Sequence, residues 1–226
     1  TRQTRKLMNK FDMRNKLISF NKHNSLSRIP KLITYLREGK SIALVSDAGM
    51  PSICDPGEDL VKNVKQNKFE TICIPGPSAA LTALISSGFP ASKFIFEGFL
   101  PKKKKEREKI LADISKNEKT TIVFESPHRL NKLLNELREH CDGQREISIS
   151  RELTKKFEEQ VNNKLDNLID TFKDRKIIGE ITIIIKGLDK SNQTEINKSE
   201  LKNELKELVS AGLSLSAASK YLAKKR

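Results

Sequence analysis

Short runs rich in Val and Ile alternate along this chain with segments whose apolar residues recur every three or four positions. Such an alternation is typical of βα units, in which mostly buried strands are followed by helices that cover the sheet. The expected strands lie at residues 17–20, 41–45, 71–74, 94–97, 120–125, 146–150 and 180–186. The pattern therefore predicts an α/β fold.

Two sets of apolar residues recur at i, i+3, i+4 and i+7, and each set predicts one amphipathic helix. The sets are Ile29, Leu32, Ile33 and Leu36, and Leu130, Leu133, Leu134 and Leu137. Gly88 and Pro90 lie between two α/β blocks, so we expect an N-terminal lobe over residues 1–90 and a C-terminal lobe over residues 91–188. A polar linker is expected at residues 189–198, before a helical tail at residues 199–226. Gly212 divides this tail, which predicts either a helix-turn-helix or an αα-hairpin.

The 226 residues include 43 Lys and Arg but only 29 Asp and Glu, which gives a net charge of +14. Such an excess favours a polyanionic partner such as nucleic acid, because each neutralised phosphate releases counterions. An ordinary basic surface is the alternative. The chain is 36% hydrophobic, which is too apolar for a disordered protein.

Three cysteines without a C-x-x-C spacing support neither a disulfide framework nor a zinc finger, and they indicate a reducing cytoplasm. The three histidines are dispersed along the chain, so we expect no metal site. The longest apolar run, at residues 181–185, is far shorter than the roughly 20 residues that span a bilayer. We therefore expect a cytoplasmic protein without a membrane span.

A stiff loop follows the expected strand at residues 41–45. Its sequence, SDAGMPSICDPG, runs from Ser46 to Gly57 and contains two Gly, two Pro and two Asp. Ligands of open α/β sheets sit beyond the carboxyl ends of the strands, so this loop is a candidate binding segment. The alternative is a well-capped turn in which the two aspartates only close Asx-turns.

A second loop, PGPSAA, follows the expected strand at residues 71–74 and opens a helix with Ser78 as its N-cap. A helix N-terminus presents free amides to an anion or a carboxylate, although an ordinary helix start is the simpler interpretation. Because the two loops end neighbouring strands, together they favour one shared ligand. The sequence contains neither G-x-G-x-x-G nor G-x-x-x-x-G-K, so NAD and ATP are poor candidates.

Six sequence blocks resemble, in order and spacing, the tetrapyrrole-methylase superfamily, which comprises the class III S-adenosylmethionine-dependent methyltransferases. The blocks are LVSDAGMPSICDPG, IPGPSAALTALISSGFP, FEGFLPKK, FESPHRL, SREL and GEITIIIKG. They look most like the bacterial branch that methylates the ribose 2'-hydroxyl of a cytidine in 16S ribosomal RNA, at the decoding centre. SDAG-x-P followed by DPG is distinctive of that branch. The resemblance covers about residues 1–187 and is weaker in the helical tail.

The resemblance implies two α/β lobes with S-adenosylmethionine bound between them, a homodimer, and 16S ribosomal RNA or the small ribosomal subunit as substrate. It implies that the first loop contacts the methyl donor through Ser46, Asp47, Ala48, Gly49, Pro51 and Ile53. The second loop would contribute Gly76, Pro77, Ser78 and Ala79. The C-terminal lobe would contribute Phe124, Glu125, Leu153, Gly179, Glu180, Ile181 and Thr182. Which of these last side chains point inward stays open, because the faces of a strand alternate.

A base or a cation near the ribose hydroxyl would assist the transfer, and the resemblance places three charged residues close enough to be weak catalytic candidates. They are Glu125, Arg151 and Glu152. An Arg–Glu ion pair that braces two strands is an equally compatible interpretation, so no base is assigned. A basic run after Pro101 is the candidate RNA-binding segment, with a solvated helix face as the alternative. It comprises Lys102, Lys103, Lys104, Lys105, Arg107 and Lys109.

The family opens with a strand, a P-x-P-I-G-N-L loop, a helix and a second strand before a Thr-Arg pair, and this sequence begins at such a pair. An N-terminal strand-helix-strand segment is therefore missing from the sequence, and we expect an exposed sheet edge. Two other functions stay open. One is methylation of a tetrapyrrole, either a corrin or sirohaem, and the other is non-catalytic binding to the ribosome.

Overall fold

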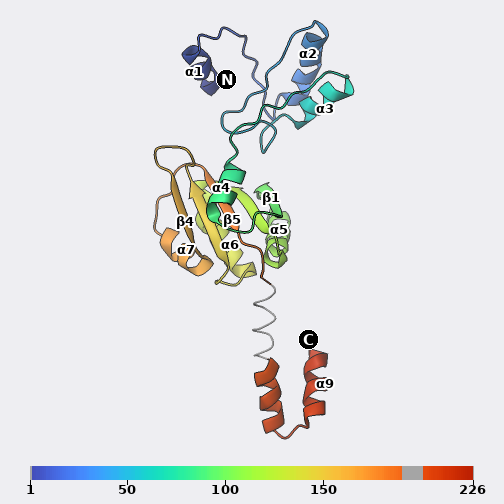
Figure 1. Cartoon of the computed structure of the whole chain (residues 1–226), viewed down its shortest axis with the longest axis vertical. Helices are drawn as coiled ribbons and strands as arrows, with labels where there is room; N and C mark the ends of the chain where they lie inside the picture. The colour runs from blue at the N-terminus through green and yellow to red at the C-terminus, as the bar shows by residue number, and fades with distance from the viewer. Residues whose placement is uncertain (1, 190–200, 226) are drawn as a thin grey trace.

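The computed structural model describes residues 2–189 and 201–225 (Figure 1). The helices are α1 (Arg2–Lys10), α2 (Ser25–Arg37), α3 (Glu58–Gln66), α4 (Ala79–Ser87), α5 (Lys104–Lys116), α6 (Leu130–His140), α7 (Leu165–Phe172), a helix over residues 201–210, and α9 (Leu215–Lys225). A 3-10 turn, η1 (Pro127–Arg129), precedes α6. The strands are β1 (Phe94–Phe99), β2 (Thr120–Glu125), β3 (Glu146–Arg151), β4 (Glu159–Lys164) and β5 (Ile181–Ile185).

The five strands form one mixed sheet in the order β1-β2-β5-β3-β4. β1 and β2 are parallel, whereas β5 runs antiparallel to both β2 and β3, and β4 is antiparallel to β3. Consequently the carboxyl ends of β1, β2 and β3 share one edge of the sheet with the start of β5. The predicted α/β class is confirmed by this mixed sheet with helices on both faces.

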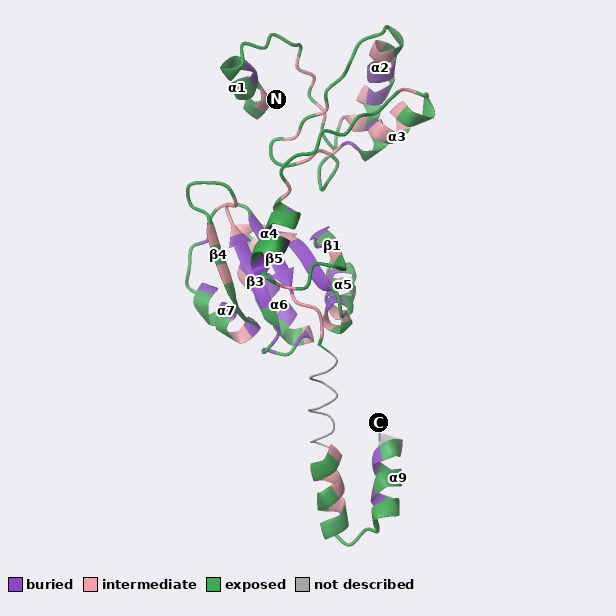
Figure 2. Ribbon diagram, in the orientation of Figure 1, coloured by how far each residue is buried: buried purple, intermediate pink, exposed green. Residues whose placement is uncertain are grey.

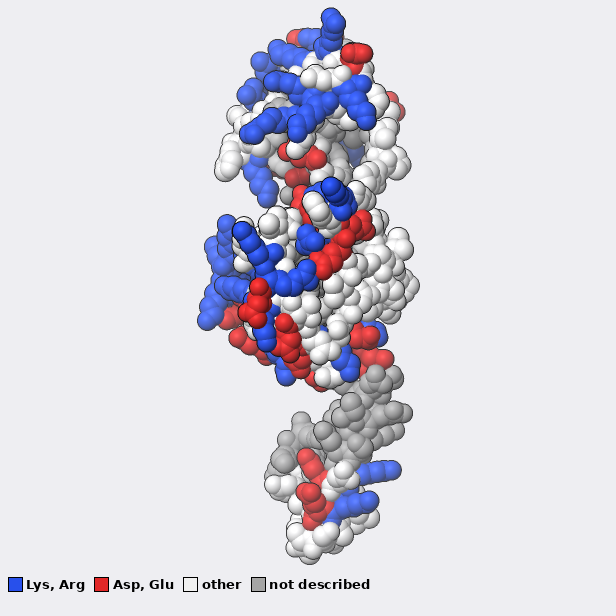
Figure 3. Space-filling model, turned by 90° about the vertical axis from the view of Figure 1, so that its left-hand side faces the viewer, with Lys and Arg blue, Asp and Glu red and all other residues white. Residues whose placement is uncertain are grey.

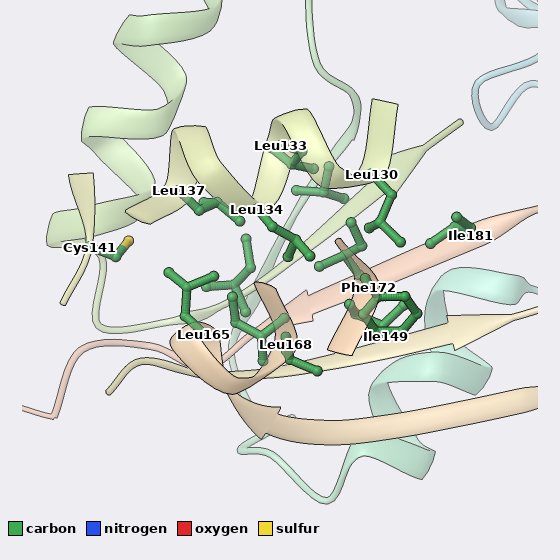
Figure 4. Packing of buried hydrophobic residues seen from close by; sticks show 14 of the residues in the cluster. Leu130, Leu133, Leu134, Leu137, Cys141, Ile149, Leu165, Leu168, Phe172 and Ile181 are labelled. Atoms are coloured by element: carbon green, nitrogen blue, oxygen red, sulfur yellow. The ribbon is translucent and has the colours of Figure 1, made fainter. Parts of the chain in front are cut away.

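Helices cover the two faces of the sheet unequally. On one face, α5, α6 and α7 bury a large apolar core against alternate residues of the strands. Figure 4 shows the leucine stripe of α6 facing α7 and the sheet, as the spacing of these residues predicts. On the other face, α4 packs with Ala83 and Leu84 against Ile122 of β2 and Ile184 of β5. The candidate active site lies at the edge of the sheet where β1, β2 and β3 end and β5 begins.

Three of the expected strands are wrong. Residues 17–20, 41–45 and 71–74 form no strand, because none of them finds a ladder partner among the described residues. The part of the chain before α4 contains only helices and loops, and it is largely exposed (Figure 2). Ile72 and Ile74, for instance, are 72% and 78% exposed. An apolar run indicates a buried strand only where other backbone is available to accept its hydrogen bonds.

One strand, β4, was missed by the sequence analysis. Its sequence, EQVNNK, contains a single apolar residue, Val161, and most of its side chains are exposed. It pairs along its whole length with β3 and forms an edge of the sheet. A polar edge strand has no hydrophobic alternation, so periodicity could not reveal it.

The expected boundary between lobes at residue 90 needs a correction. α4 packs on the sheet, and the side-chain amide of Asn162 on β4 donates to the Ser87 carbonyl oxygen at 2.9 Å. A separate small core joins α2 and α3 through Ile29, Leu32 and Leu60. The packing therefore groups α4 with the C-terminal lobe, and the N-terminal lobe ends between α3 and α4.

The expected linker at residues 189–198 lies outside the described residues, except for Asp189. In the tail, the helix over residues 201–210 and α9 lie side by side with opposite directions (Figure 1). Ala218 and Leu222 of α9 are buried, and Gly212 makes the turn with φ +96°. The αα-hairpin is therefore the form that the tail adopts. Among the described residues, no helix has the length and apolar character that crossing a membrane requires.

Candidate active site

Three sequence blocks meet at the edge of the sheet that faces the N-terminal lobe. Glu125, at the end of β2, pairs with Ile181 at the start of β5, and Arg151 of β3 pairs with Ile181 from the other side. In the same register, Phe124 and Ser150 flank Thr182. The segments FES, SREL and GEIT are therefore brought together by the sheet, as the resemblance implies.

The alternation of the strands decides which of these side chains face α4. Phe124 and Leu153 pack with Ile122, Ile184 and the buried residues of α4. Thr182 lies two residues before Ile184 and therefore points to the same face. Ile181 packs with the core under α6 and α7, on the opposite face. Phe124, Leu153 and Thr182 are thus the members of this set that lie on the α4 face of the sheet.

Gly179 allows the GEIT segment to approach β3. Its φ is +102°, and a Cβ there would lie 2.5 Å from the Glu152 carboxyl carbon. The backbone N–H of Glu180 donates to the Glu152 carboxylate at 2.9 Å, and the Glu152 N–H donates to the Glu180 carbonyl oxygen at 2.9 Å. Only glycine fits a left-handed position this close to a side chain.

The first loop is held by a hydrogen-bond network around Ser46. The Ser46 hydroxyl contacts the Asp55 carboxylate at 2.5 Å and the Ala48 carbonyl oxygen at 2.7 Å. Ser52 and Cys54 have φ values of +69° and +59°, which are unusual for residues with a side chain. Of the predicted contacts, Asp47, Ala48, Gly49 and Ile53 are exposed, while Ser46 and Pro51 are half-buried. Asp55 thus closes the loop through the Ser46 side chain, nine residues away, and not through the local backbone contact of an Asx-turn, whereas Asp47 is exposed on the loop.

The second loop leads directly into α4. The Ser78 hydroxyl accepts a hydrogen bond from the Leu81 N–H at 3.4 Å, which confirms Ser78 as the N-cap. Gly76, Pro77 and Ala79 are exposed, and Ser78 is half-buried. The helix ends at Gly88, whose φ of +71° is the usual left-handed C-cap. The first turn of α4 therefore has free backbone amides directly after the second loop.

The two loops touch one another. A Cβ placed on Gly49 would lie 3.5 Å from the Pro77 carbonyl oxygen, and one on Gly76 would lie 3.9 Å from the Met50 Cγ. The first loop also reaches the sheet, because a Cβ on Gly98 of β1 would lie only 2.7 Å from the Cys54 Sγ. The exposed backbone of both loops and the edge of the sheet are therefore neighbours, as a shared ligand requires.

Glu125, a candidate for the catalytic base, is the centre of a buried ion-pair network. Its carboxylate is fully buried and lies 3.2 Å from the Arg107 guanidinium and 2.6 Å from that of Arg129. It also accepts from the Ser126 N–H at 2.8 Å, and Arg107 contacts Glu136 at 2.6 Å. Because Arg107 links Glu125 of β2 to Glu136 of α6, and Arg129 holds Glu125 from the turn η1, the network favours a structural role for Glu125.

Arg151 and Glu152 are engaged in a similar way. Arg151 pairs with Glu159 at 3.0 Å and donates to the Ile178 carbonyl oxygen at 3.2 Å. Lys155 contacts Glu152 at 2.8 Å, and this hydrogen bond, together with that from the Glu180 N–H, lowers the pKa of Glu152. A carboxylate with a lowered pKa is a weaker base, which counts against Glu152 as the catalytic base. Glu125 and Arg151 have their own ion-pair partners, so none of the three is assigned as a base.

The basic run starts at the same edge of the sheet. β1 ends at Phe99. Lys102 and Lys103 precede α5, Lys104 and Lys105 begin it, and all four side chains are exposed. Lys103 and Lys104 pair with Glu106 and Glu108 at 3.2 and 3.7 Å. Arg107 needs a correction: it is only 5% exposed and belongs to the Glu125 network, so it cannot contact RNA.

A family model described as Tetrapyrrole (Corrin/Porphyrin) Methylases matches residues 3–169. The chain belongs to the tetrapyrrole methylase family. The match includes both loops, the basic run and the strands β1 to β4, whereas the GEIT segment follows it.

Two relatives of the tetrapyrrole methylase chain carry the name ribosomal RNA small subunit methyltransferase I. The protein of Thermotoga maritima is 44% identical over 187 residues, which cover 83% of either chain. The protein of Synechocystis sp. is 38% identical over 223 residues, which cover 99% of this chain and 80% of the relative.

Two solved structures of methyltransferases share the fold. The methyltransferase CobJ has a TM-score of 0.55 at 20% identity, over 72% of this chain and 71% of its own. Uroporphyrin-III C-methyltransferase of Thermus thermophilus, complexed with S-adenosyl homocysteine, has a TM-score of 0.50 at 16% identity, over 71% of this chain and 73% of its own. At these identities the likeness concerns the fold of a tetrapyrrole methylase.

One residue of the site in this tetrapyrrole methylase was missed by the sequence analysis. The Ser150 hydroxyl is buried beside Thr182 on the α4 face and has no hydrogen-bond partner within the described part of the chain. A buried hydroxyl without a partner costs free energy, so it is a position where a ligand atom would be stabilised. The sequence signal was the alternation of Ser148 and Ser150 with the apolar residues Ile147 and Ile149 in this strand.

Proposed function

We propose that this chain transfers the methyl group of S-adenosylmethionine to the ribose 2'-hydroxyl of a cytidine in 16S ribosomal RNA of the small ribosomal subunit. The observation that carries the proposal is the contact between the two loops, at Gly49 and Pro77, above the sheet edge that holds Phe124 and Thr182. The family, and the relatives called ribosomal RNA small subunit methyltransferase I, support methyl transfer to the RNA of the small subunit.

The residues at this edge suit the donor. S-adenosylmethionine has a cationic sulfonium, a carboxylate and a planar base, and it supplies an electrophilic methyl group when bound. The Asp47 carboxylate and the exposed loop carbonyls suit a cation, and the amides that start α4 suit a carboxylate. Phe124 and Leu153 offer apolar contact, while the Ser150 hydroxyl offers an unused hydrogen-bonding group. We assign the donor to this side of the sheet.

Positioning accounts for most of the rate that this chain supplies. Holding donor and acceptor in line lowers the barrier of a bimolecular transfer by about 7–11 kcal/mol. The Ser46–Asp55 hydrogen bond and the α4 cap fix the two loops before any ligand arrives, which avoids a loss of entropy on binding. Because Glu125, Arg151 and Glu152 all have structural partners, the mechanism assigns no side-chain base.

The test of the function is methyl transfer from tritiated S-adenosylmethionine to unmethylated small ribosomal subunits, mapped by primer extension at low nucleotide concentration. We expect one stop in the 16S RNA. Transfer to a corrin or sirohaem precursor but not to the subunits would assign the chain to tetrapyrroles. Binding to subunits without any heat of donor binding in calorimetry would make it a non-catalytic ribosome-binding protein.

The start of α5 is proposed to contact RNA phosphates. Lys102 and Lys105 are exposed, and no ion pair among the described residues includes them. Changing both to Glu should weaken binding to a single-stranded RNA and lower the slope of log K against log salt by about 1.4, since each phosphate contact contributes about 0.7. Fluorescence anisotropy at several salt concentrations measures both quantities.

The matched control is the pair Lys116→Glu with Lys119→Glu. These lysines are also exposed, but they lie near the other end of α5, which is roughly 18 Å away at about 1.5 Å per residue. The control should leave the salt slope unchanged. Equal losses in both variants would mean that only net charge matters, and the assignment of RNA contacts to Lys102 and Lys105 would then be wrong.

A homodimer is proposed through the outer face of α4. Leu81 and Ile85 are one turn apart and are 47% and 75% exposed, while the inner face of the helix packs on the sheet. Exposed apolar side chains in a stripe are typical of protein interfaces. Ile85→Asp should shift the molecular mass in solution from dimer to monomer, measured by sedimentation equilibrium. Ser86→Asp, at the neighbouring exposed position, should leave the dimer intact; a monomeric wild-type protein would refute the proposal.

A further inference from the structure

The first 40 residues contain most of the excess charge of the chain. They include eleven Lys and Arg but only Asp12 and Glu38 as acids, an excess of nine in a chain whose net charge is +14. Figure 3 shows Lys and Arg gathered over the N-terminal part of the molecule, at the top of the view. This surface is separate from the basic run of α5, because it belongs to the body formed by α2 and α3.

A groove of about 140 Å³ lies within this surface, between the extended segment at residues 16–19 and the helix α2. Lys16 lines one wall, and Arg28 and Lys31 line the other. Leu32 and Tyr35 contribute apolar area, and no acidic side chain lines the groove. Its chemistry therefore suits an anion rather than a cation or a neutral ligand.

The cations of the groove have no carboxylate partner among the residues that the structure describes, and the Lys31 ammonium lies over the Tyr35 ring at 5.9 Å from its centre. Every arginine between residues 94 and 189 contacts a carboxylate or a carbonyl oxygen of the protein: Arg107, Arg129, Arg138, Arg145, Arg151 and Arg175. In contrast, no ion pair within residues 2–189 and 201–225 includes Lys16, Arg28 or Lys31. Arg28 is also half-buried. A half-buried guanidinium without a carboxylate is stabilised when an anion binds.

The geometry of the groove fits a strand of RNA. Arg28 and Lys31 are three residues apart on α2, so their side chains leave the helix about 5–6 Å from one another. This is comparable with the spacing of successive phosphates along an RNA strand. Lys16 approaches from the opposite wall, so the three cations surround a backbone rather than form a flat patch.

We propose that this groove is a second RNA-binding site, in which Lys16, Arg28 and Lys31 hold backbone phosphates of the substrate. The proposal rests on the proposed function, because it assigns this site to the same RNA. α2 packs against α3, and α3 begins at Glu58, directly after Gly57, where the first loop ends. The groove and the loop therefore belong to one lobe, and RNA held in the groove is anchored beside the donor.

The test uses the full chain and a fluorescein-labelled single-stranded RNA of mixed sequence. In the variant Lys16→Gln, Arg28→Gln, Lys31→Gln, RNA affinity should fall at least tenfold, and the salt slope should decrease by about 2, at about 0.7 for each lost contact. The affinity for S-adenosylmethionine in calorimetry should not change. The single variant Arg28→Lys keeps the charge, so it should retain most of the wild-type affinity for RNA.

The matched control is Lys62→Gln, Lys65→Gln, Lys68→Gln, which removes the same charge from exposed positions of the same lobe outside the groove. It should retain the wild-type slope. Equal effects in the two triple variants, or none in the groove variant, would overturn the proposal. The proposal would also be overturned if the groove variant bound RNA normally but lost binding to phosphatidylserine vesicles. That result would assign the groove to membranes. A wild-type protein that binds RNA in the groove but methylates no subunit would refute the proposed function alone.

Discussion

Glu125→Ala is expected to lower the free energy of unfolding by about 3–5 kcal/mol, because it leaves the Arg107 guanidinium buried without its central partner. Arg107 is 5% exposed, and the Glu125 side chain is fully buried between Arg107 and Arg129. When one member of such a network is removed, the remaining charges stay buried without a partner that compensates for their lost hydration. Urea unfolding followed by circular dichroism measures the change.

Two comparisons show whether the effect comes from the network. Asp170→Ala breaks the Lys173–Asp170 pair, whose side chains are 59% and 76% exposed, and should cost at most about 1 kcal/mol. Arg107→Ala combined with Glu125→Ala should cost less than the sum of the single changes, by about 0.5–3 kcal/mol. If Glu125→Ala kept wild-type stability but lost methyl transfer, Glu125 would be a catalytic residue instead.

Ser78→Leu is expected to reduce the affinity for S-adenosylmethionine at least tenfold and to lower methyl transfer correspondingly. The substitution removes the hydroxyl that caps α4 and places a bulky side chain where the second loop meets the first. The loss of the cap alone costs about 1 kcal/mol of stability, which is too little to unfold a domain of ordinary stability. Isothermal titration calorimetry gives the donor affinity directly.

The matched control is Ser86→Leu, since Ser86 lies near the other end of the same helix and is also exposed. Its donor affinity should equal that of the wild type. A second variant, Asp47→Ala, changes no helix cap. It should by itself lower the affinity for S-adenosylmethionine, because it removes the carboxylate proposed to face the sulfonium. Wild-type titrations for both Ser78→Leu and Asp47→Ala would place the donor elsewhere.

The C-terminal lobe was largely predictable, because its strands are apolar runs that find partners. The strand expected at residues 120–125 is β2 with the same bounds, and the α6 leucines pack as their spacing indicates. The runs at residues 41–45 and 71–74 have similar composition but no ladder. The composition of a segment shows that it is apolar enough for a buried strand. Whether a neighbouring strand is there to pair with it depends on the rest of the fold.

The site was predictable at its loops and less so at its charged residues. Loop residues follow from local turn chemistry, so both loops and the Ser78 cap could be identified. Arg107 was misjudged because it lies within a run of lysines, and its partner Glu136 is 29 residues away. Ion pairs that close over such distances leave no local pattern in the sequence.

The two outer strands of the sheet discourage growth of the sheet into another molecule. β4 is six residues long and carries Glu159, Asn162, Asn163 and Lys164, and β1 is interrupted by a shift of register between Phe96 and Gly98. Charged side chains and bulges on an outer strand make it a poor template for a strand from a neighbour. At high concentration in the cell, this enzyme should therefore associate through packed side chains of its helices, and its sheet should not seed fibres.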